Sequence, residues 1–170
     1  MISHEPGRVT KLHAAAIASS AWVVPLALSA SSSPSPDHPR VFAWYRSLRQ
    51  PPFKPKDWVI PVAWLGIETG LAAAGYRLLR APPSGAQRRA LGWLAWNVTM
   101  IGGWSRFFFK RHNLGVSTVA AATMIASGAA YINEARRVDP VASRAGVPFL
   151  AWVSFATVLT ATIWSLNRRR

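Results

Sequence analysis

Five long apolar runs, each with few or no charged residues inside and basic residues close to its ends, dominate this sequence. They cover residues 12–30, 58–79, 90–105, 114–132 and 145–166. An α-helix rises 1.5 Å per residue, so about 20 apolar residues cross the hydrocarbon core of a bilayer. A helix also closes its backbone hydrogen bonds within one segment, which lipid requires. The pattern predicts an all-α fold, an integral membrane bundle of five transmembrane helices.

Charge is scarce and strongly basic. Charged residues make up 15% of the chain, whereas soluble domains average roughly 25%. The net charge is +14, from 20 Lys and Arg against 6 Asp and Glu. Because the basic residues flank apolar runs, we expect membrane lipid headgroups as partners and no nucleic acid. The basic residues divide almost evenly between the two sides, so they do not set the orientation, and the sequence does not say which membrane is occupied.

The segments between and beyond the runs complete the predicted organisation. Residues 1–11 form an N-terminal tail, 12–167 one membrane domain and 168–170 a basic C-terminal tail. Residues 31–57 are rich in proline and form a loop, in which 41–48 can make a short amphipathic helix. The first run has two interpretations, a membrane span or the apolar part of a cleaved signal peptide.

Two polar residues inside the runs are candidates for function. Glu68 is an ionisable residue in mid-span and shares a helix face with Trp64, four residues earlier. The alternative is a neutral Glu68 that hydrogen-bonds within the bundle. Asn97 lies on a stripe with Trp93 and Trp104, where its amide can meet a ligand or join two helices.

Enzyme signatures are absent from the sequence. The four histidines are scattered, and no metal-binding, phosphate-binding or nucleophile motif appears. The chain has no cysteine, so disulfides and thiolate metal sites are excluded. We therefore expect neither an enzyme nor a metal or other cofactor. Nine Trp are present, which favours interfacial belts, an aromatic-walled ligand cavity, or both.

Three stretches carry a family resemblance. Residues 44–64 read W-Y-R-S-L-R-Q-P-P-F-K-P-K-D-W-V-I-P-V-A-W, and residues 148–157 read P-F-L-A-W-V-S-F-A-T, followed by I-W-S-L-N at 163–167. A weaker match is L-A-W-N at 94–97 with the Phe pair at 107–108. Together these motifs resemble the first-loop and fifth-helix signatures of the tryptophan-rich sensory protein / translocator protein family (TspO/MBR).

The resemblance implies a five-helix bundle, usually a homodimer, with a ligand pocket between the helices. It implies that residues 12–30 are a retained first span and that loop 31–57 covers the pocket as a lid. Family ligands are tetrapyrroles such as porphyrin and haem, sterols and synthetic aromatic amides. The implied function is a membrane receptor or transporter for porphyrin, haem or a similar flat hydrophobic molecule, with a role in tetrapyrrole traffic or stress response.

From the residues and the resemblance together we expect a set of site residues. The lid contributes Trp44, Pro51, Phe53 and Pro55. The ligand pocket is lined or closed by Trp58, Trp64, Glu68, Asn97, Trp104, Trp152, Phe155 and Ala156. For a porphyrin, indole faces stack on the macrocycle, and the propionates point towards basic lid residues rather than Glu68. The candidate partners are Arg46, Arg49, Lys54 and Lys56.

Other functions remain open at this level. One is photo-oxidative porphyrin degradation that uses pocket tryptophans. Another is a sterol-binding translocator, although the fifth-helix sterol pattern lacks its Tyr at residues 161–163. A third is a structural or partner-binding protein whose pocket has lost its use. It is suggested by departures from the family pattern, where Glu68 replaces a Tyr, Met100 a Trp and Thr160 an Asn.

Overall fold

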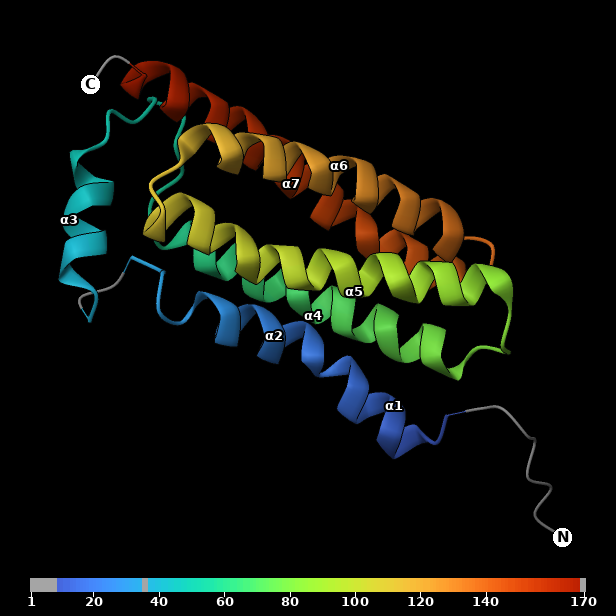
Figure 1. Cartoon of the computed structure of the whole chain (residues 1–170). Helices are drawn as coiled ribbons and strands as arrows, with labels where there is room; N and C mark the ends of the chain where they lie inside the picture. Colours follow the sequence, from blue (N-terminus) through green and yellow to red (C-terminus); the bar gives the residue numbers. More distant parts are fainter. Residues whose placement is uncertain (1–8, 35–36, 169–170) are drawn as a thin grey trace, which may run out of the picture.

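The computed structural model describes residues 9–34 and 37–168, and these residues form helices and connecting loops with no strand. Most of the predicted N-terminal tail and residues 169–170 of the predicted C-terminal tail lie outside the described residues. The helices follow one another in a simple order (Figure 1). They are α1 (Lys11–Ala18), α2 (Ser20–Ser29), α3 (Pro39–Ser47), α4 (Val59–Arg80), α5 (Gly85–Ser105), the π-helix η1 (Arg106–Lys110), α6 (Leu114–Ala135) and α7 (Pro140–Asn167).

Four helical stretches among the described residues are long and apolar enough to cross a membrane. They are Lys11–Ser29, Val59–Arg80, Leu114–Ala135 and Pro140–Asn167. The predicted span at 90–105 is also helical, within α5, but polar and small residues lower its hydropathy and it is not among the four. The predicted all-α fold is confirmed, and the predicted amphipathic helix at 41–48 is found as α3.

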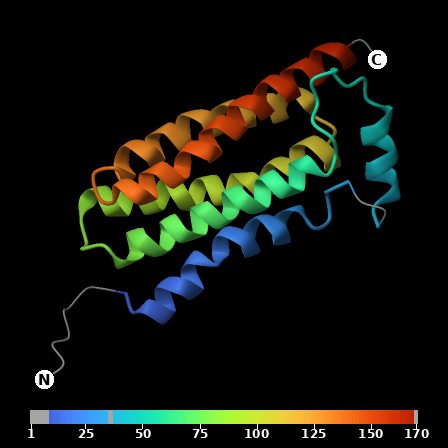
Figure 2. The ribbon, with the colours of Figure 1, turned by 180° about the vertical axis from the view of Figure 1, so that it is seen from behind.

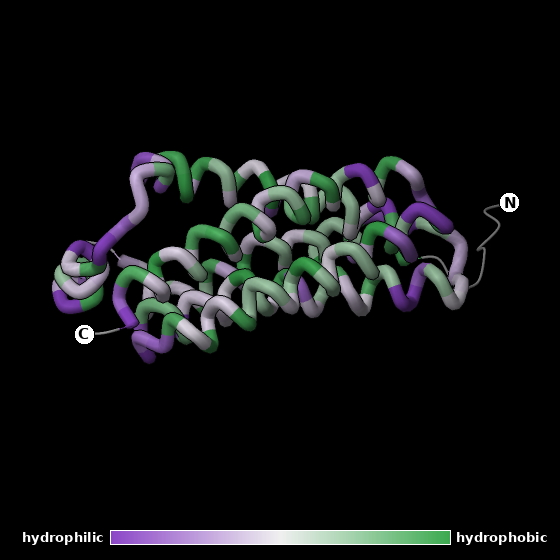
Figure 3. The backbone as a smooth tube through the Cα atoms, turned by 90° about the horizontal axis from the view of Figure 1, so that it is seen from above, coloured by the Kyte–Doolittle hydropathy of each residue, from purple (hydrophilic) through white to green (hydrophobic). Residues whose placement is uncertain are grey.

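The outer surface of the bundle is apolar. Leu12 is 84% exposed, Leu26 71% and Val119 63%, and all three lie on candidate membrane spans. Figure 3 shows that the most hydrophilic residues gather towards the ends of the bundle and along α3, whereas the middle is mostly neutral or hydrophobic. So many exposed large side chains are unfavourable in water and are the normal surface of a helix that faces lipid.

Helix caps explain why α5 and α7 begin before their apolar runs. Pro82 and Pro83 separate α4 from α5, and the Ser84 side chain then accepts a hydrogen bond from the Gln87 backbone N–H, so that α5 begins at Gly85. Asp139 caps α7 in the same way, with Pro140 at the first helical position. The polar first turns of both helices are therefore helical, although a search for apolar runs begins at residues 90 and 145.

The long helices pack in two layers with α1 and α2 along one side. Figure 1 shows α5 and α6 in front, and Figure 2, from behind, shows α4 and α7. The most extensive contact is between α6 and α7, and α2 packs on both α5 and α4. The well-packed core fills the half of the bundle near the α4–α5 and α6–α7 connections, with Leu71, Leu78, Tyr131 and Phe149 fully buried. We call this half the remote end, and the opposite end, where α3 and η1 lie, the lid end.

One close backbone contact joins α2 to α5. A Cβ atom added to Gly102 would lie 2.8 Å from both the Cα and the carbonyl oxygen of Pro25, and 2.7 Å from the Leu28 Cβ. Only a residue without a side chain allows the two helices to approach this closely. Gly103, next along α5, has nothing within 4 Å of the same added atom.

Ion pairs hold the remote end. The Arg77 Nε donates to the Asp139 Oδ2 at 2.8 Å, and the Arg89 Nη2 donates to the Glu134 Oε2 at 3.1 Å. The Asp139 Oδ1 also accepts from the backbone N–H groups of Val141 and Ala142. Burial opposes ionisation of this carboxyl, but the hydrogen bonds from the α7 backbone and Arg77 outweigh it and lower the pKa of Asp139 below its usual value.

Replacing Asp139 by alanine should destabilise the bundle in a pH-dependent way. It removes the α7 cap and the partner of Arg77, at a cost of about 1 kcal/mol at pH 7. Because the pKa of Asp139 is lowered on folding, its stabilisation is fully present above the ordinary aspartate pKa of about 3.9 and is lost as the pH falls through the folded-state value. Thermal unfolding in micelles at pH 7 and near pH 3 tests this. Asp139→Asn keeps the capping oxygen and should recover most of the loss, whereas an equal loss at both pH values would contradict the assignment.

Candidate functional site

The lid end of the bundle contains a cavity of about 540 Å³. Small-molecule sites commonly have volumes of about 300–1,000 Å³. The walls come from α2, α4, α5, η1, α6 and α7. Residues of the lid, loop 31–57, line one end of the cavity. The lining is mostly apolar and aromatic, with a few hydroxyl groups and two carboxylates.

Aromatic side chains form opposite walls of this cavity. Trp104 stacks on Phe108 with ring centroids 4.8 Å apart and an interplanar angle of 22°. The Trp104 indole N–H donates to the Ser117 carbonyl at 2.8 Å, which fixes its orientation. On the other side, Trp64 meets Trp152 edge to face, with centroids 6.3 Å apart. Flat π surfaces that are already held in place favour a flat aromatic ligand.

The π-helix η1 positions two of these aromatic residues. Phe108 is 2% exposed and lines the cavity together with Phe109. A π-helix carries one more residue per hydrogen-bonded turn than an α-helix, and such turns are frequent at functional sites. Neither residue was predicted to line the site. The sequence signal was the Phe pair at 107–108 in the weaker family match, but a π-helix cannot be recognised from that pair alone.

The lid lies across the end of the cavity. Trp44 of α3 stacks on His112, with centroids 4.0 Å apart, and meets Phe108 edge to face. Phe53 meets Phe155 edge to face at 6.4 Å, and Pro51 is buried. The four predicted lid residues lie in loop 31–57, but none of them lines the cavity. The residues of this loop that do are Ser33, Pro34, Phe42, Tyr45 and Asp57.

A side-chain amide fastens this lid to α7. The Arg49 backbone N–H donates to the Asn167 Oδ1 at 3.1 Å, and the Asn167 Nδ2 donates to the Arg49 carbonyl at 3.0 Å. Asn167 thus pairs with the Arg49 peptide groups as a neighbouring strand would. This residue ends the fifth-helix motif in the sequence, and the structure gives that position a physical role.

The charged residues that line the cavity are both acidic. They are Asp57 and Glu68, and no Lys, Arg or His is among the described lining residues. Asp57 pairs with Lys54, whose ammonium also lies over the Tyr45 ring at 5.4 Å. Burial opposes the charge on Lys54, but the hydrogen bond with Asp57 and the electrostatic attraction to Asp57 and Tyr45 together outweigh it and raise the pKa of Lys54. The four basic residues predicted to meet propionates lie in the lid segment and not in the wall.

The structure brings six of the eight predicted pocket residues together. Trp64, Glu68, Trp104, Trp152, Phe155 and Ala156 all line the cavity. Trp58 does not, because it precedes α4 and is 64% exposed. Asn97 does not either. It is 1% exposed, donates to the Trp93 carbonyl at 2.8 Å and accepts from the Ser127 hydroxyl at 2.7 Å, so it joins α5 to α6.

The nine tryptophans divide into two groups. Trp64, Trp104 and Trp152 line the cavity, and Trp44 lies in the lid against it. The other five are at least 38% exposed on the outer surface, namely Trp22, Trp58, Trp93, Trp96 and Trp164. Four tryptophans therefore fit the predicted aromatic-walled cavity, and the five exposed ones fit interfacial belts. Neither interpretation accounts for all nine.

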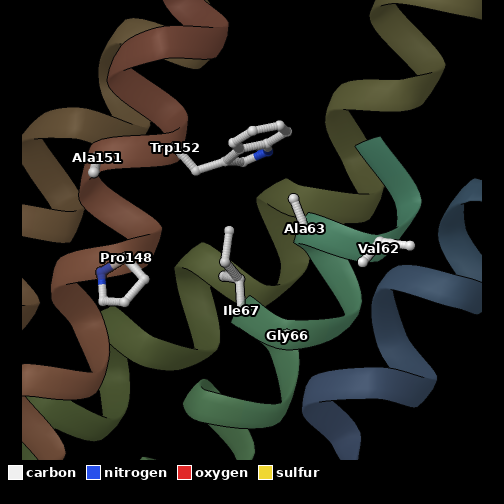
Figure 4. A pocket seen from close by; sticks show the side chains of 7 residues that line it. All are labelled: Val62, Ala63, Gly66, Ile67, Pro148, Ala151 and Trp152. Carbon is white, nitrogen blue, oxygen red and sulfur yellow. The ribbon is translucent and has the colours of Figure 1, made fainter. Parts of the chain in front are cut away.

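A second hollow of about 470 Å³ lies on the outer face between α4 and α7. It is lined by Val62, Ala63, Gly66, Ile67, Pro148, Ala151 and Trp152 (Figure 4). In Figure 4 the Trp152 indole projects from α7 towards α4. Trp152 lines this hollow and the inner cavity at once.

Comparison with known proteins agrees with this arrangement. The model of the TspO/MBR family matches residues 18–165, which contain the cavity lining, the lid and all or most of each of the five long helical stretches. The chain belongs to the TspO/MBR family. It is therefore a multi-pass integral membrane protein, as the apolar helices indicate.

Relatives within the TspO/MBR family come from animals and bacteria. The translocator protein of Ovis aries is 29% identical over 132 residues, which cover 76% of this chain and 78% of that protein. Protein CrtK of Rhodobacter capsulatus is 28% identical over 127 residues, 74% of this chain and 79% of that protein. The tryptophan-rich protein TspO of Chlorobaculum tepidum is 27% identical over 152 residues, 86% of this chain and 94% of that protein.

Proposed function

We propose that this chain is a membrane receptor or carrier that binds a porphyrin, haem or a similar flat hydrophobic molecule in the cavity beneath its lid. The observation that supports this most directly is the pair of aromatic walls, Trp104 with Phe108 and Trp64 with Trp152, around a volume of about 540 Å³. Indole faces stack on extended aromatic ligands, and burial of the ligand's apolar surface adds to the binding free energy.

The membrane arrangement is part of the proposal. All five long helical stretches cross the bilayer, including α5, which has 21 residues and packs between α2 and α6. Two copies of the chain associate, as the family resemblance implies. The names of the relatives refer to translocation and to sensing, and both activities begin with reversible binding of a small molecule.

Binding rather than catalysis is proposed because the described cavity wall lacks a general base beside a nucleophile. No His, Lys or Arg is among the described lining residues, and the carboxylates of the lining are Asp57 and Glu68. The indoles of the wall suggest light-dependent porphyrin breakdown as a second candidate. Irradiation of the complex distinguishes the two, since only breakdown gives a product spectrum that depends on the protein.

Titration of the protein in lipid nanodiscs with protoporphyrin IX tests the proposal. Saturable binding, followed by the porphyrin absorbance band, should weaken about 10- to 100-fold in Trp64→Ala, because stacking and buried area are both lost. Trp96→Ala is the matched control, since this indole is 49% exposed on the outer surface and does not line the cavity. Equal affinity in wild type, Trp64→Ala and Trp96→Ala would place the porphyrin elsewhere, and no saturable binding would reject the proposal.

A further inference from the structure

The charge of the cavity wall is opposite to that of the protein. The chain has a net charge of +14, yet the charged groups among the described lining residues are two carboxylates. A cavity made to hold an anion in its interior would place Arg or Lys in the wall, because these side chains bind carboxylates with charge-assisted hydrogen bonds. Here the basic side chains lie outside the lining, so the wall itself does not select an anionic group.

The two carboxylates differ in what they already bind. Asp57 lies at the lid and pairs with Lys54, so its charge is balanced. Glu68 lies deeper, on α4 one turn beyond Trp64 and partly buried. Among the described residues it makes no hydrogen bond, ion pair or ring contact. Arg77, further along α4, is bound to Asp139 at the remote end and does not reach into the lining.

An unpartnered carboxyl group at this depth is costly for the empty protein. Membrane-embedded acidic groups are stable when a partner or water compensates them. A ligand group that donates a charge-assisted hydrogen bond compensates Glu68 directly, and such a bond is stronger than one between neutral groups. A ligand carboxylate placed at the same point is repelled and leaves both groups desolvated.

We propose that Glu68 makes this cavity selective for a flat apolar ligand that carries a basic nitrogen, with the nitrogen directed at the α4 wall. This inference rests on the proposed function, because it assumes that the aromatic cavity holds the ligand. It names the ligand class more narrowly, as an aromatic amine or a tetrapyrrole with a cationic substituent. Acidic substituents of the same ligand then point to the lid, where Lys54 lies.

Two versions of one porphyrin test the inference. One is the neutral dimethyl ester, and the other carries an aminoethyl amide in place of one ester and is therefore cationic. In nanodiscs of zwitterionic lipid, which do not concentrate cations, the wild type should bind the cationic version about tenfold or more tightly than the neutral one. Glu68→Gln should bind both versions about equally.

Two further variants control the experiment. Glu134→Gln makes the same change at the remote end, outside the cavity, and should keep the full preference. Glu68→Tyr introduces the residue that the family pattern usually has at this position, and it provides a second variant without the carboxylate. A preference that persists in Glu68→Gln or Glu68→Tyr would overturn the inference. Equal binding of both probes by the wild type would also overturn it while the proposed function stands, and no binding of either probe would overturn both.

Discussion

Replacing Gly102 by alanine should lower the thermal unfolding midpoint sharply. The new Cβ would lie 2.8 Å from backbone atoms of Pro25, which cannot rotate away as the end of a side chain can. Helices α2 and α5 must then separate, and such overpacking costs roughly 1–3 kcal/mol, or more for Gly102→Val. The measurement is thermal unfolding of the purified protein in detergent micelles, followed by circular dichroism.

The neighbouring glycine provides the control. Gly103→Ala makes the same chemical change one residue along α5, where nothing lies within 4 Å of the new atom. It should leave the midpoint unchanged or raise it, because alanine favours a helix by about 1 kcal/mol over glycine. Similar midpoints for Gly102→Ala and Gly103→Ala would show that the contact between α2 and α5 is not as close as described.

The second large effect is expected at Asn97, where aspartate should destabilise the bundle at neutral pH. The amide group that now donates to the Trp93 carbonyl becomes a carboxylate oxygen facing that carbonyl, in a site that is 1% exposed. The Ser127 hydroxyl still donates to the other carboxylate oxygen, but a buried charge with this one neutral donor and no cation beside it costs several kcal/mol. At low pH the protonated acid can donate to Trp93 again, so the midpoints of wild type and Asn97→Asp should converge.

Asn113→Asp is the matched control for this change. Asn113 caps α6 by accepting a hydrogen bond from the Val116 backbone N–H at 3.0 Å, and aspartate caps helices equally well. This variant should therefore unfold at about the wild-type temperature at both pH values. If Asn97→Asp were as stable as Asn113→Asp at pH 7, Asn97 would have to be accessible to water or a cation, contrary to its burial.

The sequence predicted those parts of the fold that depend on composition along the chain. Apolar runs indicate membrane helices because lipid leaves the backbone few alternatives. The starts of α5 and α7 were predicted too late, because Ser84 and Asp139 begin polar helical turns that a search for apolar runs does not include. The length of an apolar run therefore underestimates the length of the helix where a capping residue and a polar first turn precede the run.

Site residues could be predicted from the sequence where their spacing places them on one face of the same helix. Trp64 and Glu68 share a face by their spacing and both line the cavity. Asn97 was expected on the face of Trp104, and both side chains do bond to α6, but Asn97 lies about two turns further from the lid end, where its amide meets Ser127 and does not line the cavity. Phe108 and Phe109 were missed because a π-helix changes the direction of side chains, and this depends on contacts with the lid and α6.

The position of Trp152 has a consequence for experiments on this protein. Its indole belongs to the cavity wall and to the hollow on the outer face, so at this point the site and the surrounding acyl chains are one side chain apart. Truncation of Trp152 would remove a stacking surface. It would also connect the outer hollow to the cavity, so that detergent or lipid tails could enter and compete with the ligand. An affinity measured for such a variant therefore depends on which detergent or lipid surrounds the protein. Trp64 lines the cavity but not the outer hollow, so Trp64→Ala is the better variant for measuring the contribution of stacking.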